Sequence, residues 1–214
     1  MKLVLYDYYR SSASYRVRIA LGLKGVDYER VPVNLLDGEQ RSIDFRARNP
    51  QGFVPMLEAD GHRITQSLAI IHWLDAAFPD PPLVPADALE RAHVVALALT
   101  IAADIHPLNN LRVLKRLKTL GLDEEVRDDW YRHWVAEGFD ALETLAGPGA
   151  GRFLFGEEVT LADICLVPQM YNARRFELPL DAYPNLVRAD AEACALEAFA
   201  AAHPERVAPA AASG

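Results

Sequence analysis

Ser11 and Ser12 stand at the start of a stretch with helical periodicity, between Arg10 and Arg16. A serine hydroxyl at a helix start can accept a hydrogen bond from a backbone N–H group, so one of the two serines is expected to cap the helix. The free N–H groups and the positive end of the helix dipole attract anions. The pattern therefore predicts either a capped amphipathic helix with solvated arginines or a site that holds an anion or a thiolate.

A second polar pair, Gln66 and Ser67, precedes another apolar helical run and indicates a second helix start. A helix cap alone would also explain this pair. Between the two helix starts, Pro55 opens a predicted strand. If the Val54–Pro55 bond is cis, the backbone N–H and C=O groups of Val54 turn outward and can pair with a peptide-like ligand as though a strand were added.

Short strand-like and helical segments alternate over the first part of the chain and would position these groups. Strands are predicted at 2–6 and 28–34, a hairpin at 54–65 that turns at Asp60 and Gly61, and helices at 12–24 and 67–78. This alternation predicts a small α/β domain over residues 1–80.

The segment FPDPPLVPAD has four prolines in ten residues, which excludes a regular helix and predicts a linker at 79–87. Helices are predicted at 88–118 with a kink at Pro107, at 123–146 and at 184–201, before a loose tail from residue 204. Another helix should begin at Thr160, because Thr160 and Asp163 form a capping box. Residues 88–214 are therefore predicted to form an all-helical domain.

The net charge of −8 at pH 7 argues against a broad surface for nucleic acid or an anionic membrane, although a local basic pocket fits it. The N-terminal stretch has too few apolar residues for a signal peptide, and no run approaches the length of a membrane span. Cys165 and Cys194 lack the spacing of metal ligands and are expected to be buried and reduced. We expect a cytoplasmic protein with no metal site and no nucleic-acid or membrane partner.

Five segments, taken in order and spacing, resemble the zeta-class glutathione transferases, a family that includes maleylacetoacetate isomerases. The segments are SSASYRVRIAL at 11–21, NPQGFVP at 49–55, QSLAII at 66–71, HPLNNLRVL at 106–114 and VTLADICLVPQ at 159–169. The resemblance implies a glutathione transferase fold, in which a thioredoxin-like N-terminal domain binds glutathione and an all-α C-terminal domain completes the site for the electrophile. It also implies a homodimer and a place in aromatic amino acid catabolism.

The resemblance assigns glutathione contacts position by position. Ser11 would donate a hydrogen bond to the glutathione sulfur, with Ser12 and Ala13 beside it at the helix mouth. Val54, before a cis Pro55, would pair with the cysteinyl backbone. The other implied contacts are Gln40, Gln66, Ser67, His106, Asn110, Leu111 and Arg112, of which Gln66 and Ser67 would hold the γ-glutamyl carboxylate.

The resemblance also bears on catalysis. Arg175 matches an arginine that binds a substrate carboxylate, and Arg10 would act with it, so that Ser11, Ser12, Arg10 and Arg175 are the predicted catalytic residues. The usual zeta motif is Ser-Ser-Cys, whereas this chain has Ala13 at the third position. Bacterial maleylpyruvate isomerases share this departure and carry the histidine that His106 matches.

The resulting prediction is a glutathione-dependent cis–trans isomerase that converts maleylacetoacetate to fumarylacetoacetate by reversible addition of the glutathione thiolate. Three alternatives stay open. The substrate can be maleylpyruvate, the chain can be a general glutathione transferase that acts on small electrophiles such as α-haloacids, or it can be an interaction module without catalysis. The joint presence of Ser11, Pro55, Gln66 and Ser67 argues against the last of these, because a scaffold would not need all four.

Overall fold

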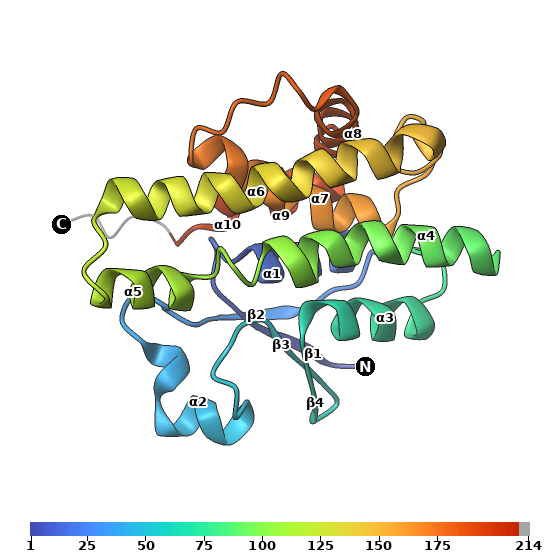
Figure 1. Ribbon diagram of the computed structural model, residues 1–214. Coiled ribbons are helices and arrows are strands. Elements are labelled where there is room, and N and C mark those ends of the chain that lie inside the picture. Colours follow the sequence, from blue (N-terminus) through green and yellow to red (C-terminus); the bar gives the residue numbers. More distant parts are fainter. Residues whose placement is uncertain (210–214) are drawn as a thin grey trace. The chain divides into compact units, whose positions relative to one another are not determined.

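Four short strands form one mixed sheet within residues 1–209, the part of the chain that the structure describes. The computed structural model (Figure 1) orders them β2-β1-β3-β4, with β1 at Leu3–Asp7, β2 at Glu29–Pro32, β3 at Met56–Ala59 and β4 at His62–Thr65. β1 is parallel to β2 and antiparallel to β3, and β3 is antiparallel to β4. The predicted hairpin is confirmed, because Asp60 and Gly61 have the positive φ angles of a two-residue turn, 46° and 85°.

Two helices of the first unit pack against each other, and a third comes from the far end of the sequence. This unit comprises residues 1–82 together with the described chain from Leu196. α1 (Ser12–Leu23) contacts both α3 (Ser67–Ala77) and α9 (Glu197–Ala202). The approach of α9 is close at Gly22, where an added Cβ atom would lie 3.2 Å from the Cβ of Ala198. A larger residue at this position would force the two helices apart.

Two short helices follow β2, in a part of the chain for which no helix was predicted. They are the 3₁₀-helix η1 (Glu39–Arg41) and the α-helix α2 (Ile43–Arg48). Ser42 caps α2, because its Oγ accepts a hydrogen bond from the Phe45 N–H group at 3.1 Å. Phe45 is the one residue of α2 that is buried. A helix this short with one buried side chain has no apolar periodicity by which it could be recognised.

The second unit, residues 83–195, is helical. Its helices are α4 (Ala88–Leu99), the π-helix η2 (Thr100–Ile105), α5 (Leu111–Thr119), α6 (Glu124–Ala146), the 3₁₀-helix η3 (Gly147–Gly149), α7 (Leu161–Arg175) and α8 (Pro184–Cys194). α7 is the central helix of this unit, since 12 of its 15 residues are buried and it contacts α4, η2 and α8. The predicted fold class, an α/β unit followed by a helical one, is confirmed.

The prediction of one kinked helix over 88–118 is wrong. α4 runs on into η2, the chain turns at 106–110, and α5 then begins anew. Pro107 lacks the N–H group that a continuing helix requires. Asn110 provides the new start, because its Oδ1 accepts a hydrogen bond from the Arg112 N–H group at 3.1 Å.

The capping box at the start of α7 is confirmed. Thr160 Oγ1 accepts from the Ala162 N–H group at 3.3 Å, and the Asp163 carboxylate accepts from the Thr160 N–H group at 2.8 Å. Asp163 also accepts from the Leu154 N–H group at 2.8 Å. Burial raises the pKa of Asp163 to about 6, although these hydrogen bonds oppose the shift.

The helix predicted at 184–201 is two helices that belong to different units. α8 ends at Cys194, and from Leu196 the chain packs with the first unit through α9 and α10 (Pro204–Val207). This packing differs from the predicted boundaries, which assigned all of 88–214 to the helical domain. α10 also lies where a loose tail was predicted, and residues 210–214 of that tail are outside the described chain. Cys165 is buried as predicted, whereas Cys194 is exposed.

Candidate functional site

Ser11 is the N-cap of α1 and closes the turn that leads into it. Its N–H group donates to the Tyr8 C=O at 2.9 Å, and its Oγ accepts from the Ser14 N–H group at 3.2 Å. The side chain is partly exposed. A hydroxyl that accepts one hydrogen bond still carries its proton. Ser11 can therefore cap the helix and donate to an anion at the same time.

Ser12 and Ala13 form the first turn of α1 behind this cap. Backbone N–H groups in a first helical turn have no acceptor within the helix, and the helix dipole adds positive potential there. Arg10, just before the cap, is exposed and lies over the ring of Tyr9 at 5.3 Å from its centre. This end of α1 therefore presents a hydroxyl, helix N–H groups and a cation together.

The start of α3 is a second polar helix end in the same unit. Gln66 occupies its N-cap position with φ 70° and ψ 121°, and its side-chain Nε2 donates to Gln51 Oε1 at 2.9 Å. Such a conformation is strained for a residue other than glycine, at a cost of about 1–3 kcal/mol, and strain of this kind often occurs at binding sites. Ser67, the first helical residue, is buried.

Arg16 links the two helix starts. Its guanidinium is buried, with 2% of the residue exposed, and Nη1 donates to Ser67 Oγ at 3.5 Å. The sequence left open a pair of solvated arginines beside the helix, and for Arg16 that alternative is wrong. The charged group is instead enclosed beside the N-termini of α1 and α3, which makes this region attractive to a carboxylate.

A loop before β3 presents backbone groups in the same unit. The Val54–Pro55 bond is cis, as the resemblance implied, and among residues 1–209 no hydrogen bond engages the backbone N–H or C=O of Val54. Asn49 braces the loop, because its Nδ2 donates to the Phe53 C=O at 2.8 Å and its Oδ1 accepts from the Gln51 N–H group at 3.2 Å. The loop can therefore pair with an extended peptide backbone.

Gln40 contacts the same loop from η1. Its side chain is buried, and its Oε1 has no hydrogen-bond partner within the described residues. A Cβ atom added to Gly52 would lie 2.8 Å from the Gln40 carbonyl oxygen, and Gly52 has φ 64°. Glycine is therefore required in the NPQGFVP segment, both for the backbone conformation and for this close approach.

Four of the predicted site residues lie in the second unit, around the break between η2 and α5. His106 follows η2, Asn110 caps α5, and Leu111 and Arg112 are its first residues. The break is held in place by α6, since Trp130 Nε1 donates to the Leu108 C=O at 2.9 Å. The structure thus brings these four residues together on one short segment.

Arg175 ends α7 in the same unit. Its Nη1 donates to Asn172 Oδ1 at 3.3 Å, and its guanidinium lies over the ring of Phe176 at 5.1 Å from the centre. Phe176 in turn stacks on Tyr131 of α6, with ring centres 3.6 Å apart and planes 6° from parallel. Burial raises the pKa of Tyr131, while the charge of Arg175 opposes that shift. The guanidinium is held by its neighbours yet exposed, as a carboxylate-binding group would need to be.

Two buried amides of the second unit were not predicted as site residues. The amide of Asn109, between His106 and α5, has no hydrogen-bond partner in the part of the chain that the structure describes, and the buried Gln169 of α7 interacts with the Tyr131 hydroxyl. Buried amides normally find partners, so Asn109 is a candidate for contact with a bound molecule. Nothing in the sequence distinguishes them from surface amides, because only tertiary packing buries them.

Within residues 1–209, no three His, Cys, Asp or Glu side chains are grouped so that they could hold a metal ion. A search of the same residues found no helix with the length and apolar character that crossing a membrane requires.

Comparison with known proteins gives matches over most of the chain. The family models for the glutathione S-transferase N-terminal and C-terminal domains match residues 1–76 and 114–188. A probable maleylacetoacetate isomerase of Vibrio cholerae is 49% identical over 96% of this chain and 97% of its own.

Solved structures are similar as well. The holo structure of a maleyl pyruvate isomerase, described as a bacterial zeta-class glutathione S-transferase, has a TM-score of 0.94 and 45% identity over 97% of this chain and all of its own. The maleylacetoacetate isomerase of Anaeromyxobacter dehalogenans, with dicarboxyethyl glutathione and citrate in its active site, has a TM-score of 0.88 and 46% identity over 98% of both chains.

Proposed function

Because this chain belongs to the glutathione S-transferase family, within the zeta-class group of maleylacetoacetate and maleylpyruvate isomerases, we propose that it is a glutathione-dependent cis–trans isomerase. Its proposed reaction converts maleylacetoacetate to fumarylacetoacetate. The observation that carries the proposal is the start of α1, where the Ser11 hydroxyl caps the helix and the exposed Arg10 immediately precedes it.

The first task of this group is to ionise the glutathione thiol. A thiol with a pKa of about 8.5 is only about 3% ionised at pH 7, and lowering its pKa by ~2 units requires roughly 2.7 kcal/mol of preferential stabilisation of the thiolate. A hydrogen bond to a charged group contributes about 1.5–3 kcal/mol, and a helix N-terminus about 0.3–1 kcal/mol. Ser11 and the first turn of α1, which contains Ser12 and Ala13, can therefore together supply the stabilisation that the thiolate requires.

The rest of glutathione would be held by groups that carry complementary chemistry. Val54, next to Pro55, would pair its backbone N–H and C=O with the cysteinyl residue, as a strand does. The γ-glutamyl carboxylate would lie at the start of α3, where Gln66, Ser67 and the buried Arg16 offer an amide, a hydroxyl and a cation. Gln40 would direct its unpartnered Oε1 at a donor of the peptide. In the helical unit, His106, Asn110, Leu111 and Arg112 would add further contacts.

The isomerisation itself needs no bond to the protein. The thiolate adds to the double bond conjugated to the ketone, and the electron pair moves onto the carbonyl oxygen to give an enolate. The former double bond is now single and rotates. The enolate then re-forms the double bond in the trans arrangement and expels the thiolate, so glutathione is not consumed. Arg10 and Arg175 would bind carboxylates and stabilise the enolate charge.

The dicarboxyethyl glutathione bound by the Anaeromyxobacter enzyme fits this chemistry. A dicarboxyethyl group on sulfur is the product expected when a thiolate adds across the double bond of a maleyl diacid. This supports the same addition as the first step here.

The second candidate reaction is the isomerisation of maleylpyruvate. Ala13 replaces the cysteine of the zeta motif, and His106 matches the histidine of bacterial maleylpyruvate isomerases. The similarity to the zeta-class maleyl pyruvate isomerase structure, with a TM-score of 0.94, supports this candidate equally. Both substrates are maleyl diacids with ketone groups, so the same thiolate and the same arginines would serve either one.

We further propose that the protein is a cytoplasmic homodimer that acts in the catabolism of aromatic amino acids. The name of the relatives, maleylacetoacetate isomerase, supports the place in catabolism, and the family resemblance supports the dimer and the location. Sedimentation of the purified protein tests the dimer, which predicts twice the mass of the 23.7 kDa chain.

The deciding experiment gives the purified protein glutathione with maleylacetoacetate or maleylpyruvate and follows each isomerisation spectrally. The Ser11→Ala variant should be strongly impaired, whereas Ser14→Ala is a matched control one turn further along the same helix. An α-haloacid in place of the maleyl compound tests general transferase activity. The faster maleyl substrate identifies the reaction. If neither is turned over and glutathione does not bind, the enzyme proposal is wrong.

A further inference from the structure

The turn that precedes α1 carries both groups on which the proposed chemistry depends. The Ser11 N–H group donates to the Tyr8 C=O at 2.9 Å, so residues 8–11 form a four-residue turn with Tyr9 and Arg10 at its centre. In such turns the peptide between the two central residues can face either way, and its orientation separates type I from type II. The direction of the Tyr9–Arg10 peptide therefore determines where Arg10 points and how the chain enters Ser11.

Arg18 holds this peptide in one orientation. It lies on α1 seven residues after Ser11, which places both residues on the same face of the helix. Its Nη2 donates to the Tyr9 C=O at 3.0 Å, and its Nη1 donates to Asp7 Oδ2 at 2.7 Å. The guanidinium is almost wholly buried, with 1% of the residue exposed. A planar group with donors in fixed directions can hold several acceptors at once, which a lysine ammonium does less well.

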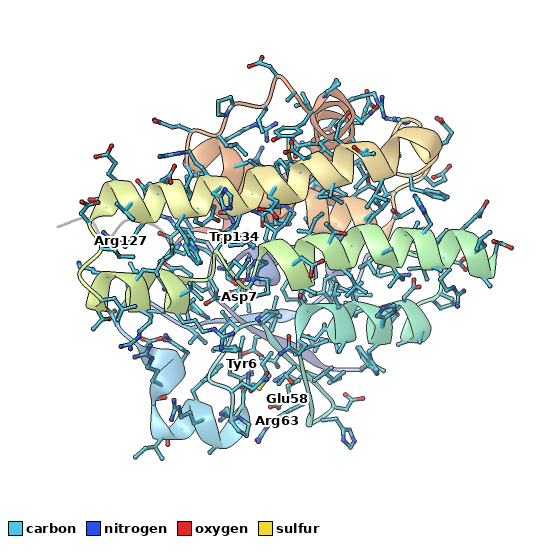
Figure 2. All side chains as sticks on the ribbon, in the orientation of Figure 1. Tyr6, Asp7, Glu58, Arg63, Arg127 and Trp134 are labelled. Carbon is cyan, nitrogen blue, oxygen red and sulfur yellow. The ribbon has the colours of Figure 1, made fainter. Side chains whose placement is uncertain are left out.

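Asp7 anchors the other end of the turn. It is the last residue of β1, and its carboxylate is shared between Arg18 and Arg30, at 2.7 Å to each (Figure 2 labels Asp7). The Asp7 C=O also accepts from the Val33 N–H group at 2.7 Å. The chain thus enters the turn from a residue whose backbone and side chain are both tied to neighbouring elements.

The third contact of Arg18 reaches the C-terminal segment. Its Nε donates to the C=O of Ala202, the last residue of α9, at 3.0 Å. Carbonyl groups in the last turn of a helix have no partner within the helix, and a cation is a favourable one. Nearby, the Tyr15 hydroxyl donates to the Phe199 C=O at 3.4 Å. One buried guanidinium therefore connects the end of β1, the turn that holds Ser11 and the end of α9.

We propose that Arg18 is a positioning residue for the isomerisation: it fixes the Tyr9–Arg10 peptide and thereby the placement of the Ser11 hydroxyl and the Arg10 guanidinium. This inference rests on the proposed function. Arg18 does not touch glutathione or the substrate in this role and acts only through the turn. Its remaining partner, the C=O of Ala202, lies in the segment that begins at Leu196.

Arg30 provides a matched control for Arg18, because it makes two of the three kinds of contact that Arg18 makes. It also donates to Asp7, at 2.7 Å, and to a C-terminal carbonyl group, that of Val207, but its hydrogen bonds do not include the turn. Arg18→Lys and Arg30→Lys therefore each keep the charge and disturb the same ion-pair network. Only Arg18→Lys loosens the Tyr9–Arg10 peptide.

The test measures three quantities in the full-length protein: the pKa of glutathione bound at the site, from the ultraviolet absorbance of its thiolate; kcat and KM for the maleyl substrate; and the midpoint of thermal unfolding. Arg18→Lys should raise the thiol pKa by about one unit and lower kcat about tenfold. Arg30→Lys should leave the thiol pKa unchanged and kcat within about twofold of wild type, even where it lowers the unfolding midpoint equally.

Several results would overturn the proposal. A wild-type thiol pKa in Arg18→Lys refutes the positioning role alone, as does an equal pKa shift in both variants. If Arg18→Lys does not fold, the Asp7→Asn/Arg18→Gln double variant replaces it, because this variant removes both buried charges together. It should show the same rise in the thiol pKa, and a wild-type thiol pKa in this variant also refutes the positioning role. If wild-type protein holds no thiolate and turns over neither substrate, the proposed function fails and takes this inference with it.

Discussion

Replacing Ser11 by alanine removes two functions at once, and their magnitudes can be separated. The Ser11 Oγ accepts from the Ser14 N–H group at 3.2 Å, and loss of such a cap costs about 1 kcal/mol of stability. The same hydroxyl is proposed to donate to the thiolate, and a hydrogen bond to a charged group contributes about 1.5–3 kcal/mol. We therefore expect the pKa of bound glutathione to rise by about 1–2 units.

The consequence at pH 7 is large. From a bound thiol pKa of about 6.5, the rise lowers the ionised fraction from about three quarters to between about 24% and 3%, with a matching fall in turnover. Titrating the ultraviolet absorbance of the bound thiolate measures the pKa directly. Urea unfolding measures the stability separately.

Two further variants separate the cap from the donor. Ser11→Asp keeps a good N-cap but has no proton to donate and adds a negative charge, so it should retain stability and raise the thiol pKa more than alanine does. Ser14→Ala should change neither quantity, because Ser14 is fully buried and its Oγ has no hydrogen-bond partner within residues 1–209. If Ser11→Ala loses stability while the thiol pKa stays at the wild-type value, Ser11 is only a cap and the reasoning is refuted.

Three other changes test the surrounding structure. Gly52→Ala should destabilise the protein more than Gly25→Ala and should weaken glutathione binding, because both glycines have φ near 60° but only at Gly52 would a Cβ meet the Gln40 carbonyl. Urea unfolding measures the stability and calorimetry measures the binding. Equal losses of stability in the two variants would contradict this reasoning. The pKa of Asp163 is raised to about 6 in the folded state, so the folded protein binds this proton more tightly than the unfolded chain does. The resulting stabilisation is complete below about pH 4 and is lost as the pH rises through 6. The stability of wild type relative to Asp163→Asn should therefore fall by up to about 3 kcal/mol between pH 4 and pH 7, and a constant difference would refute the shift. Arg16→Met should weaken glutathione binding by roughly 10- to 150-fold in calorimetry, because a buried charge-assisted contact is lost; unchanged affinity would exclude Arg16 from the site.

Local patterns were sufficient where a feature depends on neighbours in the sequence. The serine cap of α1, the turn at Asp60 and Gly61 and the capping box at Thr160 each involve residues within a few positions of one another, and all were predicted from the residues themselves. The residues left open whether Ser11 or Ser12 is the cap, and the structure shows that it is Ser11. The family resemblance supplied the cis bond before Pro55, because residue types alone favour the trans form of an X–Pro bond. The positions at which helices stop were predicted less well, because tertiary packing decides whether a long apolar run continues.

The sequence by itself determined the two helix starts and the α/β and helical parts, and it offered an anion site at the start of α1 as one of two interpretations. Only the tertiary structure decided that Arg16 is buried against Ser67 and that Arg18 ties the turn before Ser11 to Asp7 and to α9. The physical reason is distance along the chain. An arginine on a helix has the same local pattern whether it is solvated or enclosed, and what encloses Arg18 includes a helix 184 residues away.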